Sequence, residues 1–247
     1  MGFDSSALGD HHLTHNHYVQ VLPAISSLSA ISGDMQLLPL FLLPFYNPIL
    51  LAEQLATLDV ISGGRTTVIN ALGYDAAAFT AFQTTQRARV SRFTETFEIM
   101  RMLWERDGVT YKGLHYSFDA PISLNPKPIS QPLRMWIAGG AEPAIQRAAK
   151  MGDGWAIVPS WTPDQVKQGI QVYRDSLAEC GRKDSDMDIV LRRDAHLAPT
   201  SAVGYREAQT IFENGYRGFS TIEIEQSLIL GGPAECIEYL ENMQKAG

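Results

Sequence analysis

Six short apolar runs alternate with longer helical patterns along the chain, and this alternation constrains the fold more than any other feature of the sequence. Strands that are separated by helices form parallel sheets, because a parallel neighbour needs a long crossover connection. Nearly continuous apolar runs are typical of strands that are covered on both faces. The sequence therefore predicts an α/β fold of repeated βα units, whose strands span residues 6–9, 35–43, 66–73, 134–138, 154–158 and 187–194.

Capping signals mark the helices between these runs. Asn47-Pro48 supplies a cap and a first-turn proline, and Gly63-Gly64 ends the helix that follows. Residues 162–165 read Thr-Pro-Asp-Gln, a capping box that opens a helix ending near Gly181. A further helix begins at Pro143, directly after a glycine-rich turn. These signals predict where the helices of the α/β repeat begin and end.

Two helices carry predictions about which side chains face the core. The helix over residues 89–106 has Arg92 and Glu95 on its wetter side, and its apolar face consists of Val90, Phe93, Phe97, Met100 and Trp104. The last helix starts at Pro233, and its inward residues are predicted to be Ile237, Leu240 and Met243. Between residues 107 and 133 the pattern changes to a short hairpin followed by a proline-rich loop.

Composition excludes several classes of function. A net charge of -7, a pI near 5.3 and the lack of any Lys/Arg run argue against nucleic-acid binding. The apolar stretch 35–51 contains three prolines and is barely long enough for a membrane span. Two distant cysteines and an N-terminus without a basic-then-apolar leader favour the cytoplasm. We expect a neutral or anionic small molecule as the partner, with no nucleic acid and no membrane.

Five groups of residues occur in an order and at a spacing that a known family shares. They are Gly2 to His12, the helix and turn from Asn47 to Arg65, the helix with Arg89, Arg92 and Glu95, Ile137 to Ala149, and Gly152 to Trp155. In these segments the chain resembles the bacterial luciferase-like flavin monooxygenases and their deazaflavin-dependent relatives.

The resemblance implies a (β/α)8 TIM-type barrel with its active site at the carboxyl ends of the strands. Relative to that family pattern, we expect the chain to lack the first and the last strand, as a fragment of a longer product would. Residues 1–247 are then one luciferase-like domain, with residues 107–133 as an insertion at the barrel rim.

The resemblance also implies an activity. The first candidate is a monooxygenase that uses reduced FMN, supplied by a separate flavin reductase, and dioxygen on a small organic substrate. A second candidate is hydride transfer by a reduced deazaflavin coenzyme on the same fold. A third is a non-catalytic flavin-binding barrel fragment. A homodimer is the family's common assembly.

Eight residues are implied as the site. His11, the first of a His-His pair, is the catalytic candidate, because an imidazole near neutral pKa can exchange a proton beside the flavin. The cofactor-binding candidates are Pro39 and Leu40 on one strand, Asn70 and Ala71 on the next, and the turn Gly139, Gly140 and Ala141, whose amides favour a phosphate. Where many members offer a basic residue to the phosphate, this chain has Leu72, which leaves Arg89, Arg192 or Arg193 as substitutes.

Each of these residues also has a purely structural interpretation. His11 is then a solvated loop residue, Leu40 packs in the core, and the glycines serve a tight βα turn. His11, His12, His15 and His17 form a cluster without a cysteine or a second ligand group, so we predict no native metal site. Glu53 and Asp59 lie about 120° apart on a helix and do not converge as an acid–base pair, which favours structural hydrogen bonds.

Overall fold

The computed structural model describes residues 2–13, 18–214 and 228–245. By their internal contacts the residues form two compact units, Met1–Trp136 and Ile137–Gly247. The boundary falls inside one strand, β6 (Arg134–Ala138). The assignment of residues 1–247 to a single domain stays a prediction.

Parallel strands form the centre of the first unit. The hydrogen-bonded order is β1 (Ser5–Gly9), β2 (Gln36–Leu42), β3 (Thr67–Ala71) and then β6. The β1–β2 and β2–β3 pairs are parallel, as the alternation of apolar runs and helices predicts. The observed strands lie inside the predicted runs or within one residue of them, which confirms the parallel α/β class.

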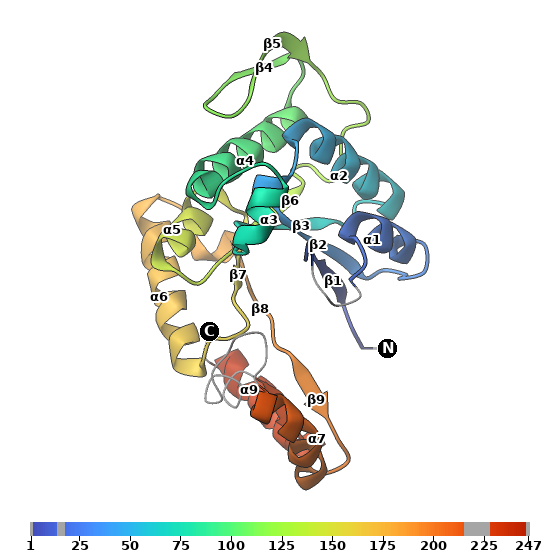
Figure 1. Ribbon diagram of the computed structural model, residues 1–247, viewed down its shortest axis with the longest axis vertical. Helices are drawn as coiled ribbons and strands as arrows, with labels where there is room; N and C mark the ends of the chain where they lie inside the picture. The colour runs from blue at the N-terminus through green and yellow to red at the C-terminus, as the bar shows by residue number, and fades with distance from the viewer. Residues whose placement is uncertain (1, 14–17, 215–227, 246–247) are drawn as a thin grey trace. The chain divides into compact units, whose positions relative to one another are not determined.

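Helices cover one face of these strands. Asn47 caps α2 (Pro48–Ser62), because its side-chain oxygen accepts hydrogen bonds from the Ile49 and Leu50 amides, and Gly63 ends the helix with a φ of 71°. Figure 1 shows α1 beside α2, and both helices are in contact with each other. The remaining helical segments of this unit are α1 (Val21–Ser29), η1 (Leu43–Phe45), α3 (Ala76–Ala81), η2 (Gln86–Ala88) and α4 (Arg89–Glu105).

The faces of α4 are only partly as predicted. Phe93, Phe97, Met100 and Trp104 are buried, whereas Val90 is 41% exposed. Glu95, predicted on the wetter side, is buried. Its carboxylate accepts the amides of Leu114, His115 and Tyr116 at 2.8–3.1 Å, and a carboxylate with three such donors is stable inside a protein. The prediction was wrong because these partners lie about twenty residues away.

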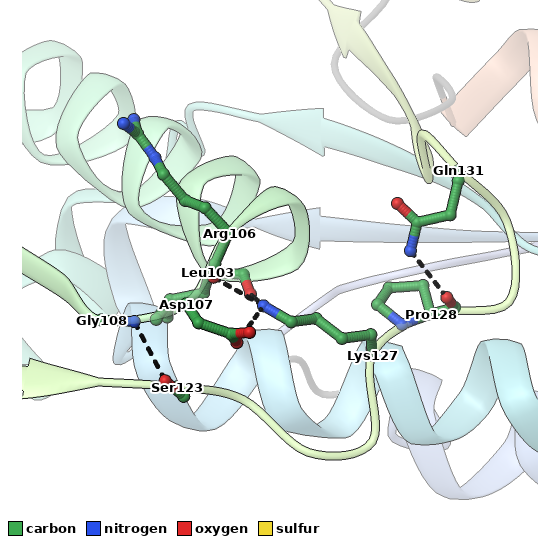
Figure 2. A network of polar contacts seen from close by, with 8 residues as sticks. All are labelled: Leu103, Arg106, Asp107, Gly108, Ser123, Lys127, Pro128 and Gln131. Carbon is green, nitrogen blue, oxygen red and sulfur yellow. Dashed lines mark hydrogen bonds and ion pairs between the residues drawn. The ribbon is translucent and has the colours of Figure 1, made fainter.

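The predicted hairpin is present in the region 107–133. Strands β4 (Val109–Lys112) and β5 (Ser117–Ile122) pair antiparallel, with the turn held by Glu95. Figure 2 shows how the following loop is fixed: Lys127 Nζ donates to the Leu103 and Arg106 carbonyls and lies 3.0 Å from an Asp107 carboxylate oxygen. This lysine therefore caps the carboxyl end of α4, where a cation is favourable.

The second unit repeats the pattern. The strand order is β6, β7 (Gly154–Ile157) and β8 (Asp188–Leu191), and β7 and β8 are parallel. The predicted capping box is confirmed at the start of α6 (Pro163–Glu179). The other helices of the second unit are α5 (Glu142–Met151), η3 (Asp184–Asp186), α7 (Ser201–Asn214) and α9 (Pro233–Lys245). Two further strands, β9 (Ala195–Leu197) and β10 (Ile229–Gly231), pair in parallel.

The inward face of α9 differs from the prediction by one residue. Ile237 and Leu240 are 57% and 54% exposed, while Cys236 is buried and Tyr239 and Met243 are partly buried. Tyr239 accepts a hydrogen bond from Arg193 at 2.8 Å, which fixes this side of the helix inward. Met243 therefore lies on the inward side as predicted, whereas the prediction was wrong for Ile237 and Leu240. No helix among the described residues is long and apolar enough to cross a membrane.

Candidate functional site

Three polar residues follow β1 directly at its carboxyl end. The first, Asp10, is held by its backbone amide, which donates to the Leu40 carbonyl of β2 at 3.0 Å. Its side chain is 1% exposed, and one carboxylate oxygen accepts the Leu42 amide at 3.1 Å and the Tyr46 hydroxyl at 2.7 Å. Asp10 therefore joins the ends of β1 and β2 and is not open to a ligand.

The Tyr46 hydroxyl completes this buried group. Burial and, secondarily, the charge and hydrogen bond of Asp10 raise the pKa of Tyr46 far above its ordinary value. The hydroxyl therefore stays protonated, and it remains a hydrogen-bond donor throughout the physiological range.

His12 lies on the same side as Asp10. Its Nε2 is 3.4 Å from the Asp10 carboxylate but makes no aligned hydrogen bond within the described residues, so the contact attracts only when the ring is protonated. The ring packs on Phe45, Tyr46 and Phe82 at centroid distances of 5.6, 6.1 and 4.8 Å. These contacts give His12 a packing role.

His11, the predicted catalytic residue, has different surroundings. Its side chain is partly exposed, and its Nδ1 lies 3.3 Å from the Tyr74 hydroxyl. The Tyr18 ring lies edge-to-face with the imidazole, at a distance of 5.3 Å between the ring centroids. Because Nδ1 has a partner and the ring is accessible, the remaining ring nitrogen can exchange a proton with a bound molecule.

The predicted residues of β2 and β3 are divided between two faces. Phe41 pairs in register with Asn70, and residues that pair directly in a sheet project to one side. Phe41 is 1% exposed and its ring meets Tyr46 at 5.3 Å, so this is the helix-covered face. Leu40 and Ala71 alternate to the opposite face, where both are partly exposed.

Asn70 is fully buried. Its amide nitrogen donates to the carbonyls of Val68 and Trp136 at 3.1 and 3.0 Å, which bridges β3 to β6. Because both partners are carbonyls, the nitrogen must be the atom that faces them. The side-chain oxygen has no partner among the described residues.

Pro39 is buried, and its peptide bond to Leu40 is not among the cis bonds of the described residues. Among the described residues the cis peptide bonds are Asn125–Pro126 and Gln131–Pro132. The backbone at Pro39-Leu40 continues as regular parallel strand, because Leu40 is in register with both neighbouring strands.

An open cavity of about 280 Å³ lies on the helix-covered side of β2. The cavity is mainly apolar, and the partly buried Tyr46 is part of its wall. Its lining residues are Gln20, Leu22, Pro23, Phe41, Tyr46 and Gln54.

In the second unit, the turn Gly139 to Ala141 links β6 to α5. A Cβ on Gly139 would lie 2.6 Å from the Ala144 Cβ, and one on Gly140 would lie 2.9 Å from a Val158 methyl. Both glycines are therefore required by close packing. The amides of Gly140 and Ala141 donate to no acceptor among the described residues, and they lie at the positive end of α5.

The three arginines considered for the phosphate are engaged to different degrees. Arg193 donates to the carbonyls of Pro159 and Trp161 at 2.9 and 2.6 Å as well as to Tyr239. Arg192 is half-exposed and paired with Asp194, and Arg89 makes only a long bond to the Gly73 carbonyl at 3.4 Å. The structure thus gives Arg193 a structural role.

Other expectations concern metal binding and the two carboxylates of α2. His15 and His17 lie outside the described residues, and within the described part no three His, Cys, Asp or Glu side chains converge on a metal position. Asp59 is buried and accepts the amide and hydroxyl of Ser130, as the structural interpretation predicts, while Glu53 is exposed.

Sequence reasoning did not single out Asp10, Tyr46 or Trp161. Asp10 and Tyr46 are 36 residues apart, and no local pattern indicates that their side chains meet. A polar residue directly after a predicted strand was the one available signal for Asp10.

The family profile described as luciferase-like monooxygenase matches residues 1–247. An F420-dependent glucose-6-phosphate dehydrogenase of Amycolatopsis mediterranei (strain U-32) is 27% identical over 72% of this chain and 53% of its own. An FMNH(2)-dependent dimethylsulfone monooxygenase of Pseudomonas fluorescens (strain Pf0-1) is 30% identical over 61% of this chain and 40% of its own. This chain spans about half the length of these relatives.

Among solved structures, the monooxygenase RslO1 from Streptomyces bottropensis superposes with a TM-score of 0.87 at 23% identity, covering 99% of this chain and 78% of that one. The likeness shows a shared fold. The profile match over residues 1–247 shows that the chain belongs to the luciferase-like monooxygenase family.

Proposed function

We propose that the chain is an oxidoreductase that binds a reduced flavin-type coenzyme and acts on a small organic substrate. The observation that carries the proposal is the pair of amides of Gly140 and Ala141 at the amino end of α5, which donate to no acceptor among the described residues. Backbone donors at a helix amino terminus favour a phosphate group, and both FMN and deazaflavin coenzymes carry one.

In the first unit the proposal assigns the ring side of the coenzyme to β2 and β3. Leu40 and Ala71, partly exposed on the face away from the helices, offer apolar contact to a flat ring. Pro39 and Asn70 are on the helix-covered face, so they are proposed to contribute through their backbone. The bond network of Asn70 keeps β3 in place for this role.

His11 is proposed as the proton-exchanging residue. The Tyr74 hydroxyl at Nδ1 fixes the ring orientation, and the other ring nitrogen holds or releases a proton toward the substrate. The bound coenzyme supplies the electrons, to dioxygen in the FMN form and directly to substrate in the deazaflavin form. The hydrogen bonds of Asp10 with Leu42 and Tyr46 hold the end of β1, which His11 follows, against the end of β2.

The first candidate is the monooxygenase, which uses reduced FMN and dioxygen and needs a separate flavin reductase. The relative from Pseudomonas fluorescens, 30% identical over its matched region, supports it. The second candidate is a deazaflavin-dependent oxidoreductase. It is favoured by the dehydrogenase from Amycolatopsis mediterranei, which matches a larger share of this chain. We also propose a homodimer as the assembly.

Anaerobic equilibrium titration of the purified chain with reduced FMN, and separately with reduced F420, tests the proposal. We expect saturable binding of one coenzyme. The coenzyme that binds more tightly separates the candidates. Dioxygen is excluded during the titration, because it oxidises free reduced FMN without any protein. If neither coenzyme binds, the proposed function is contradicted.

A further inference from the structure

Trp161 is packed between two glycines of the second unit. A Cβ on Gly140 would lie 3.0 Å from both Cζ2 and Nε1 of the indole. A Cβ on Gly169 of α6 would lie 2.2 Å from Cζ3 of the same indole. Only glycine leaves room for the indole at both places, so Gly140, Trp161 and Gly169 pack as one group.

Gly169 lowers the stability of the helix that packs against Trp161. It lies inside α6, where glycine is less favourable than alanine by about 1 kcal/mol. The residue is buried, and the indoles of Trp155 and Trp161 fill the space that a side chain would need. The chain thus gives up helix stability to seat Trp161 at this position.

The backbone at Trp161 is also fixed. Arg193 donates to the Trp161 carbonyl at 2.6 Å and to the Pro159 carbonyl at 2.9 Å. Thr162, the next residue, is the cap of α6 and is closed by the capping box with Gln165. The Trp155 ring meets the indole edge-on at 5.8 Å. The position of the indole is therefore set before any ligand arrives.

The indole nitrogen is adjacent to the turn that carries the unused amides. Trp155, its neighbour, uses its own Nε1 to donate to the Gly139 carbonyl at 2.8 Å. The Nε1 of Trp161 has no acceptor among the described residues, and its side chain is only partly buried. Because the side chain is partly exposed, this N–H is open to solvent and to a bound group. A group held at the Gly140 turn can therefore accept its hydrogen bond.

We propose that Trp161 is a coenzyme-binding residue, whose indole N–H donates to the phosphate that the Gly140 and Ala141 amides receive. The inference rests on the proposed function and adds a third donor, from a side chain, to the two backbone donors. Three neutral donors in fixed positions suit a phosphate group, and they take the place of the basic residue that is absent at Leu72.

Comparing FMN with riboflavin tests this donor, because riboflavin is the same ring system without the phosphate. Trp161→Phe removes the N–H and keeps an aromatic ring between the glycines. We expect it to lower affinity for FMN by about 10- to 100-fold, the value of one hydrogen bond to a charged group, and to leave affinity for riboflavin unchanged. If the chain selects the deazaflavin, the same comparison uses that coenzyme with and without its phosphate-bearing side chain.

Trp104→Phe is the matched control. Its indole N–H donates to the Ala52 carbonyl, so this substitution also removes one hydrogen bond but lies in the first unit. It should lower stability without changing the ratio of the FMN affinity to the riboflavin affinity. If Trp161→Phe lowers both affinities by the same factor, Trp161 only packs, and the inference is overturned.

A second measurement does not depend on the folding of the variant. The chain has four tryptophans, and the Nε1–H resonance of Trp161 can be assigned in isotope-labelled wild-type protein by connecting it to the backbone amide of the same residue. FMN should shift this resonance and riboflavin should not. If wild-type protein binds no coenzyme, the proposed function itself fails; if it binds FMN and the resonance does not move, only the inference about Trp161 fails.

Discussion

Two segments follow parallel strands in this chain and use their polar groups in opposite ways. After β1, Asp10 and His12 are buried, and the Asp10 carboxylate is engaged with Leu42 and Tyr46. After β6, the turn Gly139 to Ala141 has no polar side chain, and the amides of Gly140 and Ala141 are unused among the described residues.

The difference teaches that a polar residue at a strand end is not by itself a ligand site. Buried polar groups must be paired, so Asp10 is committed to holding β1 and β2 together. His11, between two buried neighbours, is the residue of that segment with an accessible ring. In the second unit the backbone is the candidate ligand, because glycine allows close approach.

Substitution of Asp10 should have the largest effect. Asp10→Ala leaves the Leu42 amide and the Tyr46 hydroxyl without an acceptor, and we expect the free energy of unfolding to fall by about 3 kcal/mol. Asp4→Ala, at an exposed carboxylate, should stay within about 0.5 kcal/mol. Urea unfolding measures both free-energy changes. Equal losses in the two variants would mean that the Asp10 carboxylate does not hold β1 and β2 together.

The neighbouring histidines should separate catalysis from packing. His11→Asn should lower turnover with the selected coenzyme by about 100-fold, the lower range for loss of an acid–base group, with little change in unfolding. His12→Asn should instead destabilise by about 1–2 kcal/mol, because its ring fills a pocket of three aromatic rings. Steady-state rates and urea unfolding decide, and a reversed pattern would exchange the two roles.

In the glycine turn, Gly140→Ala should cost about 1–2 kcal/mol in stability and weaken coenzyme binding. The added Cβ would lie 2.9 Å from Val158 and 3.0 Å from the Trp161 indole, which forces the turn to move. Gly2→Ala is the control, because no atom lies within 4 Å of its added Cβ. Thermal unfolding and titration with coenzyme measure the two effects. Unaltered binding in Gly140→Ala would argue against a ligand at this turn.

The smallest effect concerns the cap at the start of α9. The hydrogen bond from Ser201, with a further bond from the Gly232 amide, lowers the pKa of Glu235 below its ordinary value of 4.5. A lowered carboxyl pKa contributes stability above the ordinary value and loses it as pH falls through the lowered one. Ser201→Ala should therefore flatten the acid side of the unfolding temperature against pH. An unchanged profile would mean that this bond is not formed in solution.

The sequence predicted the six parallel strands because apolar runs and helical periodicity are local signals. It missed α1, whose buried stripe is only Val21, Ile25 and Ser29 and whose start has no side-chain cap. It also missed β9 and β10, because three residues are too few to show a period.

The site was predicted in part for the same reason. The place of His11 after β1 and the glycine turn before α5 follow from local patterns. The contact that marks His11, with Tyr74, joins residues 63 positions apart, and the contact between Trp161 and Gly140 joins residues 21 positions apart. Such contacts are set by the packing of whole elements, and no spacing rule predicts them.

The most direct test of the phosphate site at Gly140 and Ala141 is the amide NMR spectrum of the isotope-labelled chain, recorded with and without the coenzyme that the titration selects. We predict that the Gly140 and Ala141 amide resonances shift strongly at saturation, as expected for new hydrogen bonds to phosphate. The Leu42 amide, already bonded to Asp10, should shift little. Saturation of the protein without any change at Gly140 and Ala141 would contradict this phosphate site.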